Sequence, residues 1–270
     1  MNDSTSPAIR AVAVRLDDAV RAATTTDRPS QTTPLTLTEA YAVQRAGVAL
    51  RAARGDVQAG VKLGFTSRAK AEQMGVADVI AGVITRSMQV ADGGTLDVDR
   101  LIHARVEPEV AFRLGSDLDP HAGGDPLDAV AEIAPALEVI DSRYQAFRFS
   151  LEDVVADNTS ASRFVVGPWT PFDDARARLD LADLDVSLEI DGAVAAAGST
   201  AAILGDPLEA MAAIRRMAAE HGLVMPAGTI VLAGAATEAV PLPTTPGAAV
   251  SATVVGLGTV SLSIAAGGGS

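Results

Sequence analysis

The chain has 270 residues, of which 48% are hydrophobic, 3% aromatic and 20% charged, and it carries a formal net charge of −13 with no cysteine. This composition supports a sizeable core built mainly from Ala, Val, Leu and Ile. The acidic balance argues against nucleic acid and anionic membranes, and the lack of cysteine excludes disulfides, thiolate metal sites and a Cys nucleophile. The first residues lack the pattern of a signal peptide and no apolar stretch is long enough to span a bilayer, so we expect a cytoplasmic protein.

Residues 1–58 are predicted to form a helical N-terminal region. Helical spacing begins near Ile9, and a Thr/Pro-rich linker follows it. Thr36 and Glu39 have the spacing of a capping box, which predicts a helix that Gly55 ends.

Residues 59–266 are predicted to form a β-rich catalytic body, which makes the fold class α+β. Short apolar runs broken by glycine and aspartate predict strands at 60–65, 104–114, 135–142, 163–167, 184–190, 229–233 and 249–263. One late helix is expected over 207–220. Asp206 and Glu209 would form its capping box, Pro207 its first position and Gly222 its end.

Two glutamates in the segment LIHARVEPEVAF stand two residues apart. On a strand, Glu107 and Glu109 point to the same face. Such close like charges need a cation between them, and a divalent ion with oxygen ligands is suitable. Because Pro108 is disfavoured inside a central strand, the competing interpretation is an edge strand with a solvated acidic face.

A third glutamate, Glu138, lies within the apolar run IAPALEVIDSR, which is typical of a strand buried on both faces. A buried carboxylate needs a cation or a proton. Glu107, Glu109 and Glu138 together would form a triad for Mg²⁺ or Mn²⁺, with positions left for water and substrate. An ion pair between Glu138 and an arginine such as Arg143 is the alternative, and the pattern alone leaves both open.

Two polar segments flank these strands. In KLGFTSRAKAEQMGV the simplest interpretation makes Lys62 and Arg68 solvated charges, and the same segment contains Lys70. The cluster ADNTSASRF is typical of a turn rich in bonds from side chain to backbone. Its polar residues are Asp157, Asn158, Ser160 and Arg163.

Together these segments resemble the fumarylacetoacetate hydrolase superfamily, in its hydratase/decarboxylase branch of meta-cleavage pathways of aromatic catabolism. AYAVQRAGVALR, KLGFTSRAKAEQMGV, IHARVEPEVAF and ALEVIDSRYQAFRFSLEDVVADNTSASRFVVG carry the resemblance, in family order. The resemblance implies the β-rich fold of that family and a metal on the glutamate triad. It implies that Lys62 and Asp157 are catalytic. It also implies that substrate is bound by Arg68, Lys70, Asn158, Ser160 and Arg163, while Arg143 is a further candidate for a distal carboxylate.

The activity that the resemblance implies is metal-dependent loss of CO₂ from 2-oxo-3-hexenedioate, a small 2-oxo dicarboxylate, with the metal rather than a Schiff base as electron sink. It also implies a homo-oligomer and association with a 2-oxopent-4-enoate hydratase. Three alternatives stay open. The first is hydratase activity with the same metal. The second is acylpyruvate hydrolysis, for which the sequence offers no persuasive His–Glu pair. The third is a non-catalytic partner subunit, against which the intact triad argues.

Overall fold

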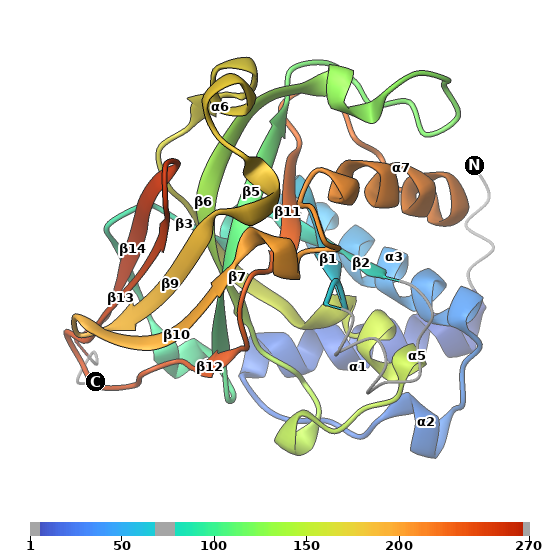
Figure 1. Cartoon of the computed structure of the whole chain (residues 1–270). Helices are drawn as coiled ribbons and strands as arrows, with labels where there is room; N and C mark the ends of the chain where they lie inside the picture. The colour runs from blue at the N-terminus through green and yellow to red at the C-terminus, as the bar shows by residue number, and fades with distance from the viewer. Residues whose placement is uncertain (1–5, 68–78, 267–270) are drawn as a thin grey trace.

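The computed structural model describes residues 6–67 and 79–266, and in these ranges helices come first and a sheet-rich body follows (Figure 1). The helices are α1 (Pro7–Ala22), α2 (Pro29–Thr32) and α3 (Leu37–Ala53). The predicted α+β class is therefore confirmed. The short helix α2 lies inside the segment that was expected to be a linker.

The two long N-terminal helices, α1 and α3, pack against each other, and α3 also contacts the sheet-rich body. The Ser6 side chain caps α1 by accepting from Ile9 N. The predicted capping box of Thr36 and Glu39 is present at the start of α3. Buried Gln44 of α3 donates to the carbonyl oxygens of Ala81 at 2.9 Å and Val155 at 3.1 Å, which fixes two later segments of the chain to this helix.

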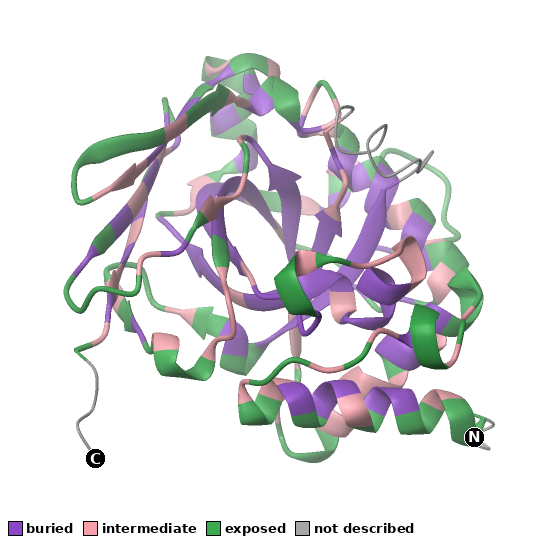
Figure 2. Ribbon diagram, turned by 90° about the horizontal axis from the view of Figure 1, so that it is seen from below, coloured by how far each residue is buried: buried purple, intermediate pink, exposed green. Residues whose placement is uncertain are grey.

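The larger sheet has nine strands within the described residues, with the order β2-β1-β11-β5-β6-β7-β3 and with β12 on β5 and β8 on β6. Its strands are β1 (Gln58–Gly64), β2 (Ile80–Thr85), β3 (Gln89–Val90), β5 (Arg105–Leu114), β6 (Val130–Ile140), β7 (Ala161–Val166), β8 (Thr170–Pro171), β11 (Ile230–Ala235) and β12 (Val240–Pro241). Figure 2 shows that the middle of this sheet is buried. Since β5 lies between β11 and β6, its expected alternative as an edge strand is wrong.

Pro108 is tolerated inside β5 because the neighbouring ladder changes register beside it. The pairing of β11 with β5 shifts between Leu232 and Ala235, and Ala235 is the partner of Glu109. The Pro108 carbonyl still accepts from Ala236 N at 2.9 Å, so the proline keeps its acceptor bond across this irregularity.

A second sheet packs against the first and has the order β10-β9-β13-β14-β4 within the described chain. Its strands are β4 (Gly94–Leu96), β9 (Asp185–Ile190), β10 (Ala193–Ser199), β13 (Ala249–Val254) and β14 (Gly258–Ile264). The single strand expected over 249–263 is thus a hairpin. Val139 and Val165 of the first sheet share a core with Val250 and Val260 of the second.

The remaining helices are α5 (Leu151–Ala156), α6 (Phe172–Arg178) and α7 (Glu209–His221). The predicted late helix is present, but it starts at Glu209 and without the expected capping box. Instead, the Asp206 carboxylate accepts from Leu208 N at 2.8 Å in the turn before the helix. Gly222, with a φ of 69°, ends α7 as expected. None of the helices in the described ranges is long and apolar enough to cross a membrane.

Candidate metal centre and adjoining cavity

The three predicted glutamates meet on one face of the central strands. Glu107 of β5 pairs directly with Glu138 of β6, and Glu109 lies two residues further along β5. All three are buried, with at most 6% of each residue exposed. One carboxylate oxygen from each lies within 4.8 Å of the others, and no other group of this kind occurs among the described residues.

The triad is electrostatically costly without a cation. Oε1 of Glu109 and Oε1 of Glu138 are buried without a hydrogen-bond partner. Burial, followed by repulsion from Glu138, raises the pKa of Glu109 well above its ordinary value. The pKa of Glu138 is also raised, because burial outweighs the attraction of Lys62.

Lys62 on β1 is the one side-chain cation paired with the triad within the described chain. Its Nζ lies 2.9 Å from Glu138 Oε2 and donates to the Thr159 carbonyl at 3.3 Å. Burial lowers the pKa of Lys62, but attraction to the carboxylates, Glu138 first, more than offsets this and leaves the pKa raised. The alternative pairing of Glu138 with Arg143 is wrong, because the Arg143 guanidinium pairs with Asp157.

A divalent cation fits this arrangement. Oε1 of Glu109 and Oε1 of Glu138 are buried without a donor, and each of the three carboxylates offers an oxygen within 4.8 Å of the others. Oxygen ligands at about 2.0–2.6 Å are those that Mg²⁺ and Ca²⁺ take, and a shared ion would lower the raised pKa values of Glu109 and Glu138.

Gly234 of β11 fixes the orientation of one carboxylate. Its N–H donates to Glu109 Oε2 at 2.8 Å. Its φ is +114°, and a Cβ at this position would lie 2.1 Å from Thr66 Oγ1. Only glycine fits both the conformation and the contact with Thr66.

A cavity of about 480 Å³ opens beside Lys62 and Glu107. Its walls combine apolar and aromatic side chains with three guanidinium groups and two hydroxyl residues, Thr159 and Ser160. The apolar part consists of Phe65, Ile80, Ile140, Phe147, Phe149 and Val154, and the polar part includes Arg28, Arg105, Arg148 and Ser160. This combination suits a small organic anion.

The three arginines of this cavity were not singled out in the sequence. Arg105 lies two residues before Glu107 on β5, so the parity that joins the two glutamates also places Arg105 on their face. Its guanidinium lies 5.0 Å from the centre of the Phe147 ring. Arg148 lies in the quoted segment DSRYQAFRF. Arg28 had no sequence signal, because its position depends on a contact between Ser30 and Asp153.

The segment between α5 and β7 borders both Lys62 and the cavity. Asn158, Thr159 and Ser160 have φ values of 51°, 55° and 57°, three successive residues in the left-handed region. The Asn158 amide holds this strained segment to β2, because it accepts from Val83 N at 2.8 Å and donates to Val83 O at 2.7 Å. Buried Ser160 Oγ has no hydrogen-bond partner.

Other predicted site residues lie away from the cavity. Asp157 is buried and pairs with Arg143, whose guanidinium also donates to the carbonyl oxygens of Asp141 and Asp157. Arg163 borders a separate cavity. Direct contacts of Asp157, Asn158 and Arg163 with substrate therefore stay predictions. Arg68 and Lys70 lie outside the described residues.

Residues 47–265 match the family model of the fumarylacetoacetate (FAA) hydrolase C-terminal domain. The chain belongs to the fumarylacetoacetate hydrolase family.

Relatives of two enzyme types are similar to most of this chain. A 4-oxalocrotonate decarboxylase of Pseudomonas sp. is 44% identical over 258 residues, which cover 94% of this chain and 97% of the relative. The 2-keto-4-pentenoate hydratase of Burkholderia vietnamiensis is 36% identical over 200 residues, with 73% and 75% covered. The structure of 4-oxalocrotonate decarboxylase from Pseudomonas putida G7 with magnesium and adipate superposes with a TM-score of 0.88 at 35% identity, over 95% of this chain and 97% of that one.

Proposed function

We propose that this protein is a metal-dependent decarboxylase of 2-oxo-3-hexenedioate, also called 4-oxalocrotonate, and releases CO₂ and 2-hydroxypenta-2,4-dienoate. One observation carries the proposal. A buried carboxylate triad with a paired lysine borders a cavity whose lining also includes three guanidinium groups. The similarity to 4-oxalocrotonate decarboxylases, one of them solved with magnesium and a six-carbon dicarboxylate, supports it.

The metal end of the site belongs to Glu107, Glu109 and Glu138, which would hold Mg²⁺ or Mn²⁺. When bound, the ion supplies a Lewis acid at the 2-oxo acid end of the substrate. Lys62 contributes a fixed positive charge beside Glu138 and a donor for a substrate oxygen. Because burial and the carboxylates hold this ammonium in one place, it stabilises negative charge that develops nearby without reorganisation.

At the other end of the substrate, the apolar walls and the arginines have different roles. Phe147, Phe149 and Ile140 would surround the bond that breaks, and a surrounding of this kind favours spread-out charge over a compact carboxylate. Tight pairing of the leaving carboxylate would oppose its loss as CO₂. Arg105 and Arg148 are exposed at the cavity, where they would attract and orient the dianion while solvent weakens their hold.

The segment 157–160 borders the cavity and holds Lys62 in position. Ser160 presents an unpartnered hydroxyl at the cavity, and we assign it a contact with substrate. We assign Asn158 and Asp157 a positioning role. Their side chains are engaged by Val83 and Arg143, and they hold the strained backbone that gives Lys62 its carbonyl acceptor.

Hydration of 2-hydroxypenta-2,4-dienoate is the second candidate, because the hydratase relatives share most of this chain. The metal end of the site suits both reactions. The arginines favour the decarboxylase, because a substrate with two carboxylates uses a cationic far end and a mono-carboxylate does not.

The decisive experiment compares both reactions on one preparation with Mg²⁺. CO₂ release from 2-oxo-3-hexenedioate should exceed hydration of 2-hydroxypenta-2,4-dienoate. Faster hydration would make the hydratase assignment correct, and neither reaction in metal-loaded protein would favour a non-catalytic subunit.

Assembly, location and domain division complete the proposal. We propose that the chain forms a homo-oligomer in the cytoplasm and associates with a 2-oxopent-4-enoate hydratase, which would limit escape of the unstable dienol. Residues 1–58 and 59–266 are proposed as the helical region and the catalytic domain. Association of the two purified enzymes in gel filtration would test the partnership.

A further inference from the structure

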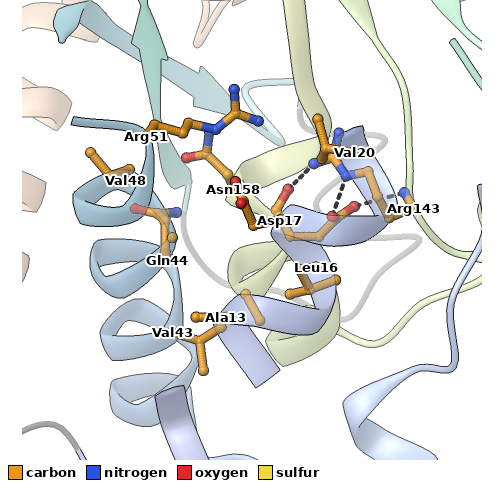
Figure 3. A pocket seen from close by; sticks show the side chains of 13 residues that line it. Ala13, Leu16, Asp17, Val20, Val43, Gln44, Val48, Arg51, Arg143 and Asn158 are labelled. Atoms are coloured by element: carbon orange, nitrogen blue, oxygen red, sulfur yellow. Dashed lines mark hydrogen bonds and ion pairs between the residues drawn. The ribbon is translucent and has the colours of Figure 1, made fainter. Parts of the chain in front are cut away.

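A second cavity, of about 470 Å³, lies between the N-terminal helices and the body and is lined by arginines. It shares no lining residue with the cavity beside the triad among the described residues. Five arginines from five parts of the chain border it, which are Arg21, Arg51, Arg100, Arg143 and Arg163. They come from α1, α3, the 3₁₀ turn Val98–Arg100, the segment after β6, and β7. Figure 3 shows Arg51 and Arg143 in the adjoining cleft between α1 and α3.

Two of these guanidinium groups are largely covered, and only Arg51 has a carboxylate within 4 Å among the described residues. Arg163 donates to the Ser162 carbonyl at 2.8 Å, and no carboxylate of the described residues lies within 4 Å of it. Arg51 lies 3.7 Å from Asp56. Burial lowers the pKa of Arg163 and of Arg51, and the nearby carboxylates offset only part of this effect.

One carboxylate, Asp141, lines the cavity, and Asp56 lies beside it; both already accept hydrogen bonds. Asp141 accepts from the backbone N–H groups of Ile102 and His103, both at 2.9 Å. Asp56 accepts from Ser87 N at 2.9 Å, from Ser87 Oγ at 2.7 Å and from Thr85 Oγ1 at 2.8 Å. These donors take up part of the acceptor capacity of both carboxylates and leave them less able to compensate the five arginines.

This concentration of positive charge has no role in the proposed decarboxylation. Arginines remain charged at all physiological pH values, so Arg51 and Arg163 cannot escape the cost of burial by losing a proton. An anion in the cavity would remove that cost, and guanidinium forks match the oxygens of carboxylates and phosphates.

We propose that this cavity is a second ligand site, which binds a small multivalent oxyanion, a dicarboxylate or a phosphate, through Arg51, Arg163 and Arg100. The volume suits a metabolite-sized ligand. Arg143 also lines the cavity and adds positive charge, but its guanidinium already pairs with Asp157. The predicted carboxylate-binding role of Arg163 thereby moves from the substrate to this second ligand.

Calorimetric titration of the metal-free, full-length protein with inorganic phosphate, and separately with succinate, tests the site. We expect one bound equivalent of at least one of these anions, and at least tenfold weaker binding in Arg163→Gln and in Arg51→Gln. Binding of both anions indicates general oxyanion recognition, and binding of succinate alone indicates a carboxylate site. No binding of either anion up to roughly 20 mM, which would occupy most of a millimolar site, overturns the proposal.

Two controls separate this site from the catalytic cavity and from a structural role. Arg148→Gln alters the catalytic cavity and should leave the anion affinity unchanged, as should Arg176→Gln on the exposed surface of α6. Without added anion, Arg163→Met should keep or raise the melting temperature, because it removes a poorly compensated charge. A lower melting temperature in Arg163→Met, together with unchanged anion binding in Arg163→Gln, would show that these arginines are structural.

Discussion

Lys62 and Glu138 form an ion pair although two strands of the sheet separate them. Lys62 is on β1 and Glu138 on β6, with β11 and β5 between, yet Nζ and Oε2 are 2.9 Å apart. In a flat sheet, three spacings of about 4.8 Å would put their backbones about 14 Å apart. The sheet must therefore curve around the site, and the concave face gathers charges that a flat sheet would keep apart.

Removal of one carboxylate should separate metal binding from folding. In Glu109→Gln we expect loss of most activity and of the rise in melting temperature that Mg²⁺ produces. The metal-free variant should be at least as stable as the wild type, because it removes a buried charge whose pKa is raised. Thermal unfolding with Mg²⁺ and with EDTA measures this. Glu132→Gln, on the same face of β6 but paired with Arg113, is the matched control and should behave as wild type. Full activity of Glu109→Gln, or of the EDTA-treated enzyme, would contradict the triad.

Lys62→Met should lower kcat/KM at least about tenfold, which corresponds to about 1.4 kcal/mol of transition-state stabilisation. The reason is the loss of a fixed positive charge beside the metal ligands. Borohydride treatment during turnover should trap no adduct, as mass spectrometry of the intact protein would show. A covalent adduct at Lys62 would overturn the assignment of the metal as electron sink.

Charge removal at the far end of the cavity should alter substrate preference. We expect Arg148→Gln to raise KM for 2-oxo-3-hexenedioate by about threefold to tenfold, with less effect on kcat, since an exposed cation attracts the dianion without joining the chemistry. The effect should shrink as salt is added. Hydration of the mono-carboxylate dienoate, where measurable, should change less. Steady-state kinetics at two ionic strengths test this, and an equal loss for both substrates would argue against a role in recognising the second carboxylate.

Gly234→Ala should damage the metal centre through the backbone. The new Cβ would collide with Thr66 at a φ that L-residues rarely adopt, and any adjustment moves the N–H that holds Glu109. We expect lower thermal stability and weaker Mg²⁺ binding. Gly47→Ala is the control, because nothing lies within 4 Å of its added Cβ on α3. This control should be neutral or more stable by up to about 1 kcal/mol. Wild-type Mg²⁺ affinity in Gly234→Ala would contradict the link to Glu109.

The stability contributed by Asp157 should depend on pH. Burial, only partly offset by Arg143, raises the pKa of Asp157 to about 6 from its ordinary value of 3.8. A carboxyl with a raised folded-state pKa binds its proton more tightly in the folded state, so its contribution is fully present below pH 3.8 and is lost as pH rises through 6. The difference in unfolding free energy between wild type and Asp157→Asn should fall by about 3 kcal/mol across this window. Denaturant unfolding between the two pH values measures it, and a flat difference would contradict the raised pKa.

Strand alternation and helix-capping residues correctly predicted those features of the fold that are set by residues close together in the sequence. Strand parity placed Glu107 and Glu109 on one face, and the capping residues Thr36 and Glu39 marked the start of α3 correctly. The same parity would have added Arg105. The strand β2 was not predicted, although all six of its residues are buried.

Long-range contacts account for what the sequence could not give. The curvature that brings Lys62 to Glu138 arises from strand order, and no local motif encodes strand order. Arg28 borders the catalytic cavity, and the backbone N–H and hydroxyl of Ser30 bind Asp153 of α5, 123 residues further along the chain. Arg143 was a reasonable partner for Glu138 by proximity in sequence, but the turn after β6 directs it to Asp157.

The carboxylate triad is built into the middle of a sheet, whereas two of the three arginines around the cavity come from segments outside it, and Arg28 precedes the stretch that matches the family model. Divergence within the family can therefore proceed at two different rates. On the proposed function, a change in the triad should abolish metal binding, while exchange of the segment around Arg28 or Arg148 should alter which acid is admitted and leave the metal centre intact. Substitutions in the segments outside the sheet would then change the preferred substrate without a change in the metal ligands. Hydratases and decarboxylases of one ancestry can diverge by this route.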